Sequence, residues 1–298
     1  MSGHHESAPC GQARLFLAPA KVNLALRVVG KRADGYHLLE SVLAFFPLYD
    51  YLEITVIEEG VHLICEPEVT AHPEQNLVFR AAQSLLQATG VRKGARLRLR
   101  KQIPDGAGLG GGSSDAAVTL LALDRLWGLE LGWERLLTLG GALGADIPFF
   151  LGGQTALVQG VGEVLTPVPH CPSAELVLIY PGISLSTQRV FHALAGRFPS
   201  GRGPLSLPGH DADLVSTLEN DLEAPACELA PVIAEGILAL QKVGALGTLM
   251  SGSGSSVFGV FPDAVTAAHA VERLTAQYVG WRVFAGRIFH THPFFDES

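Results

Sequence analysis

The sequence predicts an α+β fold of two domains, and three observations lead to this prediction. The chain has 298 residues, and at roughly 150 residues per domain this length suggests two domains or one large one. Hydrophobic residues make up 48% of the chain and charged residues 17%, which is enough apolar material for a packed core. The order of expected strands and helices favours two α+β layers over a doubly wound sheet.

The first half of the chain begins with strands and then changes to a helical period. Arg96, Arg98 and Arg100 alternate with apolar residues, so we expect a half-buried strand with these arginines on a solvated face. Apolar residues from Leu77 onward fall on one helical face, and Gly90 ends that helix. We expect strands over residues 22–29, 41–46, 51–57, 61–65 and 96–100, and helices over 76–89, 113–127 and 136–143.

The second half mixes both element types, and its proline-rich segment 167–173 is the expected domain boundary. Residues 1–13 are expected to be a flexible tail, residues 14–170 the N-terminal domain and residues 171–298 the C-terminal domain. We expect strands over residues 155–158, 163–167, 176–180, 255–261 and 281–288, helices over 187–194, 213–218, 232–240 and 264–277, and a loop over 196–210.

Charge, hydropathy and cysteine usage exclude several classes of protein. The formal net charge of −8 argues against a nucleic-acid binder, which needs a broad basic surface. The sequence has no run of about 18 apolar residues that could form a membrane span, and no segment has the pattern of a signal peptide. The four cysteines lie far apart without a C-x-x-C pair, which favours reduced thiols over a metal site. Likewise His290 and His292 have no further ligand nearby. We expect a cytoplasmic protein without a membrane or nucleic-acid partner.

The stretch Pro104–Ser114 has the composition of a phosphate-binding loop. Five glycines stand within seven residues between an expected strand and an expected helix, where backbone N–H groups and the helix dipole attract an anion. A dinucleotide fingerprint is disfavoured because Asp124 lies inside the helix, and a Walker A loop is excluded because no lysine ends the loop. A tight structural turn stays as an alternative, although it would need only one or two glycines.

Two charged residues are candidates for chemistry beside this loop, which has no cation of its own. Lys21 stands in an apolar strand, where an ammonium needs either a partner or a function. Asp146 stands between apolar residues before Ile147-Pro148, so it is either a helix N-cap or a functional carboxylate. The residues alone leave both alternatives open.

Several segments together resemble the GHMP kinases, the family of galactokinase, homoserine kinase and mevalonate kinase. Pro104–Ser114 resembles the phosphate loop of this family, Ser251–Ser256 its C-terminal glycine motif and Pro19–Leu24 its first motif. The run Lys31–Ser41, supported by the segments 144–148 and 160–163, resembles a branch whose substrate is a cytidine diphosphate-linked methylerythritol. The likeness extends from about residue 15 to residue 290, and five motifs occur in the family's order.

The resemblance implies an ATP-dependent kinase whose N-terminal domain binds ATP, with Mg²⁺ as cofactor and the active site in the cleft between two domains. It implies that Lys21 and Asp146 are catalytic, and it implies a monomer or weak homodimer. The positions that match the phosphate-binding residues are Pro104, Asp105, Gly106, Ala107, Gly108, Leu109, Gly110, Gly111, Gly112, Ser113 and Ser114. Those that match the substrate-binding residues are Asn23, Tyr36, His37, Val161, Thr187 and Phe191.

Some of these assignments have structural alternatives. An aromatic face and an imidazole suit a flat pyrimidine, yet Tyr36 and His37 also follow an Asp-Gly turn and could serve only the core. Phe191 is either a stacking wall or a core residue. Asp115 stands where some relatives have Asn, and we expect it to face the loop or the metal. The rival functions are a GHMP kinase for another acceptor, such as homoserine or mevalonate, and a nucleotide-binding protein that has lost catalysis.

Overall fold

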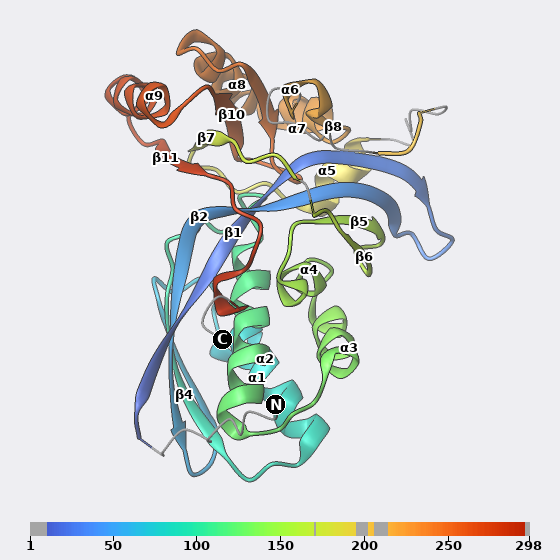
Figure 1. Cartoon of the computed structure of the whole chain (residues 1–298), viewed down its shortest axis with the longest axis vertical. Coiled ribbons are helices and arrows are strands. Elements are labelled where there is room, and N and C mark those ends of the chain that lie inside the picture. Colours follow the sequence, from blue (N-terminus) through green and yellow to red (C-terminus); the bar gives the residue numbers. More distant parts are fainter. Residues whose placement is uncertain (1–10, 170, 195–201, 206–213, 296–298) are drawn as a thin grey trace.

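The computed structural model describes residues 11–169, 171–194, 202–205 and 214–295. The described residues form a larger lobe, in the lower part of Figure 1, and a smaller lobe above it. The larger lobe is built on a seven-stranded sheet and the smaller lobe on a four-stranded sheet, each covered by helices. The prediction of a two-domain α+β fold is confirmed, whereas its boundary at residues 170 and 171 stays a prediction.

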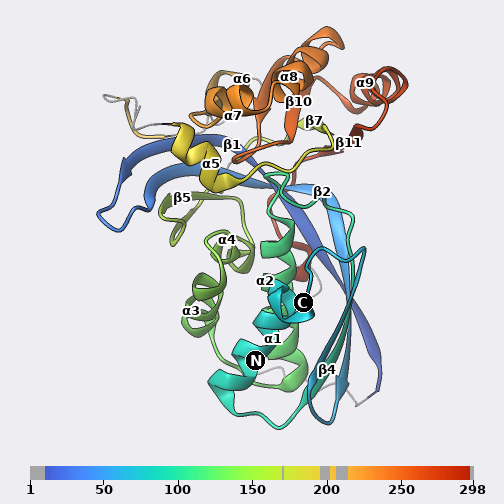
Figure 2. The ribbon, with the colours of Figure 1, turned by 180° about the vertical axis from the view of Figure 1, so that it is seen from behind.

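The seven-stranded sheet is organised around one long antiparallel pair, β1 (Ala13–Lys31) and β2 (His37–Ile57). The sheet has the order β3-β4-β2-β1-β8, and β5 pairs with both β2 and β6. Its remaining strands are β3 (Val61–Glu66), β4 (Gly94–Arg100), β5 (Ala156–Gly160), β6 (Val164–Pro167) and β8 (Glu219–Asn220). Figures 1 and 2 show β1 and β2 rising from the larger lobe and continuing beneath the smaller one.

Strand β1 contributes to three hydrophobic clusters in succession along its 19 residues. Phe16 and Ala18 belong to the cluster of the larger lobe, Val22 and Leu24 to a cluster between the lobes, and Val28 to the cluster of the smaller lobe. Successive side chains of a strand point to opposite faces, so Lys21 and Asn23, on either side of Val22, point to the face opposite Val22. The pleat therefore directs the polar residues of the middle section, Lys21 and Asn23, to a face of their own.

Helices cover the larger sheet on one side, and the longest of them, α2 (Gly111–Trp127), begins at the glycine-rich loop. Its side chains are buried nearly all round because it packs against α1, α4, β1 and β2. This burial explains the almost continuous apolar run in its sequence. The other helices of this lobe are η1 (Pro73–Gln75), α1 (Leu77–Thr89), α3 (Trp133–Leu143) and α4 (Ile147–Gly152).

The four-stranded sheet has the order β11-β7-β10-β9, and helices α8 and α9 pack against it. Its strands are β7 (Glu175–Tyr180), β9 (Gly247–Met250), β10 (Val257–Phe261) and β11 (Arg282–Arg287). The helices of this lobe are α5 (Thr187–Ala193), α6 (Leu214–Thr217), α7 (Glu223–Leu229), α8 (Val232–Lys242) and α9 (Ala264–Gln277).

After β11 the chain returns to the larger lobe and packs beside α2 (Figure 1). Phe289 forms a β-bridge with Phe45, and Thr291 forms one with Gln154. Phe294, in the short helix η3 (Pro293–Phe295), enters the core of the larger lobe. His292 is fully buried in the same region. The segment after β11 therefore connects the smaller lobe to the core of the larger lobe.

Several expected elements differ from the observed ones in extent. Residues 41–46 and 51–57 belong to one continuous strand, β2, which runs through Pro47, and β1 starts at Ala13 rather than at residue 22. Elements β8, β9, α4 and α7 were not expected. Arg96, Arg98 and Arg100 are exposed, as predicted. The expected loop 196–210 lies mostly outside the described residues, and so does the tail up to residue 10. Within the described part of the chain, no helix has the length and apolar character needed to cross a membrane.

Candidate active site

The glycine-rich loop joins β4 to α2 and packs tightly against other parts of the chain. Gly106, Gly108 and Gly110 have φ angles of 61°, 76° and 70°, a region that disfavours residues with a Cβ. A Cβ on Gly108 would lie 2.1 Å from the carbonyl oxygen of Ser251. Gly108 is thus required by close backbone approach, and the loop leads into the N-terminal end of α2 with its unpaired N–H groups.

Backbone and hydroxyl hydrogen bonds hold this loop between β1 and the C-terminal glycine motif. The N–H of Lys21 donates to the carbonyl oxygen of Leu109 at 2.9 Å, and the N–H of Ser256 donates to that of Ala107 at 3.1 Å. The Ser251 hydroxyl donates to the carbonyl oxygen of Gly108 at 3.0 Å. Three segments that lie far apart in the sequence therefore form one structural unit.

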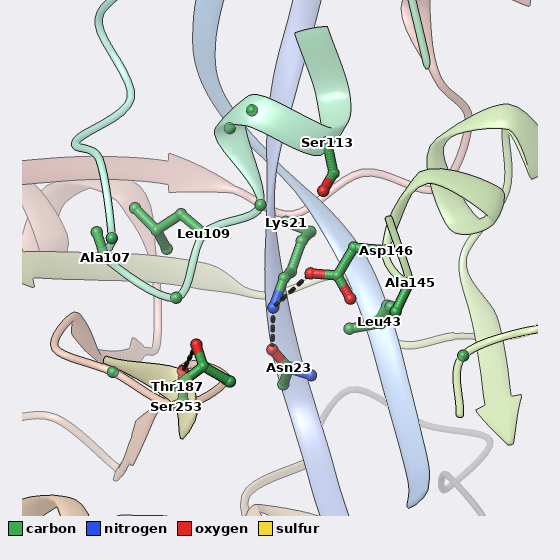
Figure 3. A pocket seen from close by; sticks show the side chains of 18 of the residues that line it. Lys21, Asn23, Leu43, Ala107, Leu109, Ser113, Ala145, Asp146, Thr187 and Ser253 are labelled. Atoms are coloured by element: carbon green, nitrogen blue, oxygen red, sulfur yellow. Dashed lines mark hydrogen bonds and ion pairs between the residues drawn. The ribbon is translucent and has the colours of Figure 1, made fainter. Parts of the chain in front are cut away.

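Lys21 carries a buried ammonium beside this unit, with a side chain that is only 4% exposed. Its Nζ donates to Asn23 Oδ1 at 2.6 Å and lies 4.0 Å from Asp146 Oδ2 (Figure 3). Burial lowers the pKa of Lys21, and the Asp146 carboxylate partly opposes that effect. Asn23 is in turn fixed by Ser41, whose hydroxyl accepts from Asn23 Nδ2 at 2.8 Å. This chain of contacts orients the ammonium.

Asp146 occupies the N-cap position of α4, but its side chain makes no capping hydrogen bond. The backbone of Asp146 has helical angles, φ −84° and ψ −13°, instead of the extended conformation typical of an N-cap residue. The side chain is 46% exposed and points toward Lys21 and the start of α2 (Figure 3). The capping alternative is therefore wrong, and the carboxylate is available to a ligand.

A cavity of about 420 Å³ opens between these groups and the smaller lobe. Both catalytic candidates line it, as do four of the six residues expected to bind substrate and all of the loop except Ser114. The sequence-predicted residues that line the cavity are Lys21, Asn23, Asp146, Val161, Thr187, Phe191 and residues 104–113. Ser114 is fully buried instead.

Tyr36 and His37 lie at one end of this arrangement and do not line the cavity directly. The His37 ring stacks on Phe191 with a centroid distance of 4.7 Å and an interplanar angle of 22°. Tyr36 is 65% exposed. The Thr187 hydroxyl forms a hydrogen bond of 2.8 Å with the Ser253 hydroxyl (Figure 3). Two aromatic faces and paired hydroxyls are thus presented near the cavity.

Two parts of the site were not among the site residues predicted from the sequence. Gly252, Ser253 and Gly254 line the cavity, and their glycine motif was the available signal. Lys101 also lines the cavity, and its ammonium contacts Asp50 and Asp115 at 2.5 and 2.7 Å. Lys101 directly follows the expected strand 96–100 and breaks its alternation of charged and apolar residues, which was the available signal.

Asp115 was expected to face the loop or the metal, and this contact places it beneath the loop, outside the cavity lining. Its side chain is 3% exposed, is absent from the cavity lining and pairs with Lys101 instead of facing the cavity. The reason is its position on α2, where Asp115 lies among the buried residues of the helix.

Among the described residues, no group of three or more His, Cys, Asp or Glu side chains could hold a metal ion. His292 does not provide a metal ligand through its Nδ1, because this atom accepts a hydrogen bond from the N–H of Phe294 within the core. Magnesium bound by proteins at nucleotide sites usually takes most of its ligands from phosphates and water. The residues present fit Mg²⁺ that enters with a nucleotide.

Comparisons with known proteins agree with this geometry. Residues 76–154 match the model of the GHMP kinases N terminal domain, and residues 207–280 match that of the GHMP kinases C terminal domain. A solved homoserine kinase from Cytophaga hutchinsonii is similar with a TM-score of 0.69 over 96% of this chain and 97% of that chain. Its sequence identity of 18% supports the fold alone.

More similar proteins share a single name, 4-diphosphocytidyl-2-C-methyl-D-erythritol kinase. The protein of Syntrophotalea carbinolica is 42% identical over 91% of this chain and 97% of its own length. The protein of Chromobacterium violaceum is 42% identical over 95% of this chain and 97% of its own length. A crystal structure of 4-(cytidine 5'-diphospho)-2C-methyl-D-erythritol kinase is 40% identical, with a TM-score of 0.78 over 92% and 99%. The chain therefore belongs to the 4-diphosphocytidyl-2-C-methyl-D-erythritol kinases within the GHMP kinase family.

Proposed function

We propose that this protein transfers the γ-phosphoryl group of ATP to the 2-hydroxyl of 4-diphosphocytidyl-2-C-methyl-D-erythritol. The products are the 2-phosphate and ADP, and the reaction serves the non-mevalonate route to isoprenoid precursors. The observation that carries the proposal is the position of Lys21 and Asp146, 4.0 Å apart beside the glycine-rich loop. High identity over nearly the whole length of enzymes with this name supports the choice of acceptor.

Asp146 is the proposed general base. Its carboxylate is exposed to the cavity and makes no capping hydrogen bond. It can therefore accept the proton of the acceptor hydroxyl as that oxygen attacks the γ-phosphorus. The ammonium of Lys21 offsets the negative charge on the transferring group. The transition state of phosphoryl transfer is loose, so positioning and electrostatics contribute most of the catalysis.

The glycine-rich loop holds the phosphates in this proposal. Its backbone N–H groups and the N-terminal end of α2 favour negative charge, and Pro104–Ser113 line the same cavity as Lys21. Mg²⁺ would be held beside the glycine-rich loop mainly by the nucleotide's own phosphates and by water, and it would supply positive charge against that of the phosphates. Ser114 lies outside the cavity, since its side chain is buried within α2.

The cytidine end of the acceptor is assigned to the aromatic pair His37 and Phe191. Phe191 lines the cavity and His37 stacks on it, and a pyrimidine can stack on such an aromatic surface while an imidazole meets its polar edge. Tyr36 is exposed next to this pair and can cover the base from outside. Asn23, Val161 and Thr187 then contact the part of the acceptor between the base and the reacting hydroxyl.

The direct test is release of ADP from Mg-ATP, measured with and without the cytidine-linked acceptor. Release that needs this acceptor is the expected result, with methylerythritol phosphate, homoserine and mevalonate as acceptor controls. Equal release with one of the other acceptors would replace the proposed substrate. Binding of Mg-ATP without any release would favour a protein that has lost catalysis. A cytoplasmic location and a monomer or weak homodimer stay predictions.

A further inference from the structure

A buried cluster of three charged side chains lies beneath the glycine-rich loop. Lys101, directly after β4, places its Nζ 2.5 Å from Asp50 Oδ2 on β2 and 2.7 Å from Asp115 Oδ2 on α2. The three side chains are 6%, 0% and 3% exposed, respectively. One ammonium thus bridges two carboxylates from different elements, and we call these residues the Asp50–Lys101–Asp115 triad.

The triad fastens both ends of the loop. Asp50 Oδ1 accepts from the backbone N–H of Gln102 at 2.5 Å and of Ile103 at 2.9 Å, the residues directly before the loop. Asp115 follows the last residue of the loop and is tied to the same ammonium. A Cβ on Gly111 would lie 3.2 Å from Lys101 Nζ, so the ammonium also touches the loop itself. Any change of charge in the triad acts directly on the loop.

The charges of the triad do not balance. With both carboxylates ionised, one ammonium leaves a net charge of −1 beneath a site built for a polyanion, which opposes binding of a triphosphate. Asp115 Oδ1 is buried without a hydrogen-bond partner, so it is the oxygen on which a proton is best accommodated. Burial and the charge of Asp50 together raise the pKa of Asp115 to about 7, although Lys101 opposes both effects.

We propose that binding of the ATP triphosphate is coupled to uptake of one proton from solvent at Asp115 Oδ1, and that Asp115 is thereby a proton-dependent positioning residue for the loop. The added anion disfavours the ionised carboxylate, and the new O–H leaves the ammonium of Lys101 balanced by Asp50 alone. The inference rests on the proposed function, because it takes ATP as the ligand of the cradle.

Other titratable groups around Asp115 do not offer the same site. Cys65 on β3 interacts with the triad, but burial raises the pKa of its thiol, which is therefore already protonated. Lys21 on β1 is directed to Asn23 and Asp146. Helices α1 and α3 also pack on α2, and their charged residues, Arg80, Glu134 and Arg135, are exposed. Asp124, further along α2, accepts from the N–H of Leu131.

The sign of the pH dependence follows from these positions. Below pH 7 Asp115 already carries its proton in the free protein, so ATP binding takes up little more. Above pH 7 the free carboxylate is ionised, and binding must bring in the proton at a cost that grows with pH. Affinity for ATP should therefore fall from pH 7 to pH 9 in the wild-type protein. Asp115→Asn, which is neutral at every pH and similar in shape, should remove this component.

The test is calorimetry of Mg-ATP binding without acceptor, from pH 6 to pH 9, in pairs of buffers with different ionisation enthalpies. At pH 8 the wild-type protein should take up close to one proton, and Asp115→Asn should take up markedly less. At pH 9 Asp115→Asn should bind Mg-ATP at least about fivefold more tightly than the wild-type protein, with equal affinities at pH 6. Asp124→Asn, on the same helix, is the matched control and should behave like the wild-type protein.

Parallel affinity curves for the wild-type protein and Asp115→Asn would overturn the inference, and so would the absence of proton uptake at pH 8. The uptake measurement needs only the wild-type protein, so it decides the question even if the variant does not fold. If Mg-ATP does not bind at any pH, the proposed function fails and this inference fails with it. Binding without proton uptake would overturn the inference alone.

Discussion

The carboxylate of Asp146 allows the sharpest test of the proposed mechanism, because the structure separates its chemical role from a structural one. Asp146→Asn removes the negative charge and the proton acceptor while it keeps the size of the side chain. The side chain makes no capping hydrogen bond, so the substitution should leave the free energy of unfolding within about 0.5 kcal/mol. Loss of a positioned base should lower kcat by ~10²–10⁴-fold, which corresponds to about 2.7–5.5 kcal/mol of transition-state stabilisation.

The assay combines steady-state ADP release with urea unfolding and Mg-ATP binding, and Asp263 supplies the control. Asp263 is also an N-cap aspartate, but its Oδ1 does accept from the N–H of Thr266 at 2.8 Å. Asp263→Ala should therefore lower stability measurably and leave kcat unchanged, the reverse of Asp146→Asn. Near-normal kcat in Asp146→Asn would refute the assignment of the base. A large loss of stability there would show that Asp146 supports the fold.

Three further predictions concern the acceptor, the loop and the core. His37→Ala should raise KM for the cytidine-linked acceptor about tenfold and leave KM for Mg-ATP unchanged, because a stacked ring is lost; equal rises in both would contradict this. Gly108→Ala should abolish Mg-ATP binding in calorimetry, whereas Gly128→Ala, with a similar φ of 66° but no atom within 4 Å of the new Cβ, should bind normally. Burial lowers the pKa of His292 to about 3, so between pH 7 and pH 4 only the unfolded chain binds a proton at this residue. Lowering the pH from 7 to 4 should therefore reduce the unfolding free energy of the wild-type protein by about 3 kcal/mol more than that of His292→Asn. Equal reductions in urea unfolding would contradict this prediction.

Local patterns in the sequence predicted those helices and strands that keep the same face buried, and the same face exposed, from one end to the other. The alternation around Arg98 marks a strand with one solvated face, and the residues from Leu77 onward mark a helix with one buried face. Strand β2 escaped this reasoning because it crosses from one hydrophobic cluster to another. Its interruption at Pro47 resembles a turn, yet the two flanking segments pair with β1 across register shifts. Such continuity depends on a partner strand that no local pattern reveals.

The candidate site shows the same division between local and tertiary information. Glycine content predicted the loop, and a lone charge among apolar residues singled out Lys21 and Asp146. The sequence left their roles open because an N-cap and a general base have the same local pattern, and only the backbone angles of Asp146 distinguish them. Asp50 and Lys101 escaped notice since their pairing joins residues 51 positions apart. A buried ion pair has no sequence signature unless both partners can be placed.

The contacts of the loop indicate why ATP binding and the arrangement of the lobes are connected. The loop is held on one side by β1, through Leu109, and on the other by the smaller lobe, through Ser251. Ser251 also bonds Asn23, which orients the ammonium of Lys21. A shift of the smaller lobe therefore moves the phosphate loop and the proposed catalytic cation together. Ser251→Ala should consequently lower both Mg-ATP affinity and kcat, by roughly tenfold each if about 1.4 kcal/mol of hydrogen bonding is lost. A loss of affinity with unchanged kcat would show that the loop and Lys21 are positioned independently.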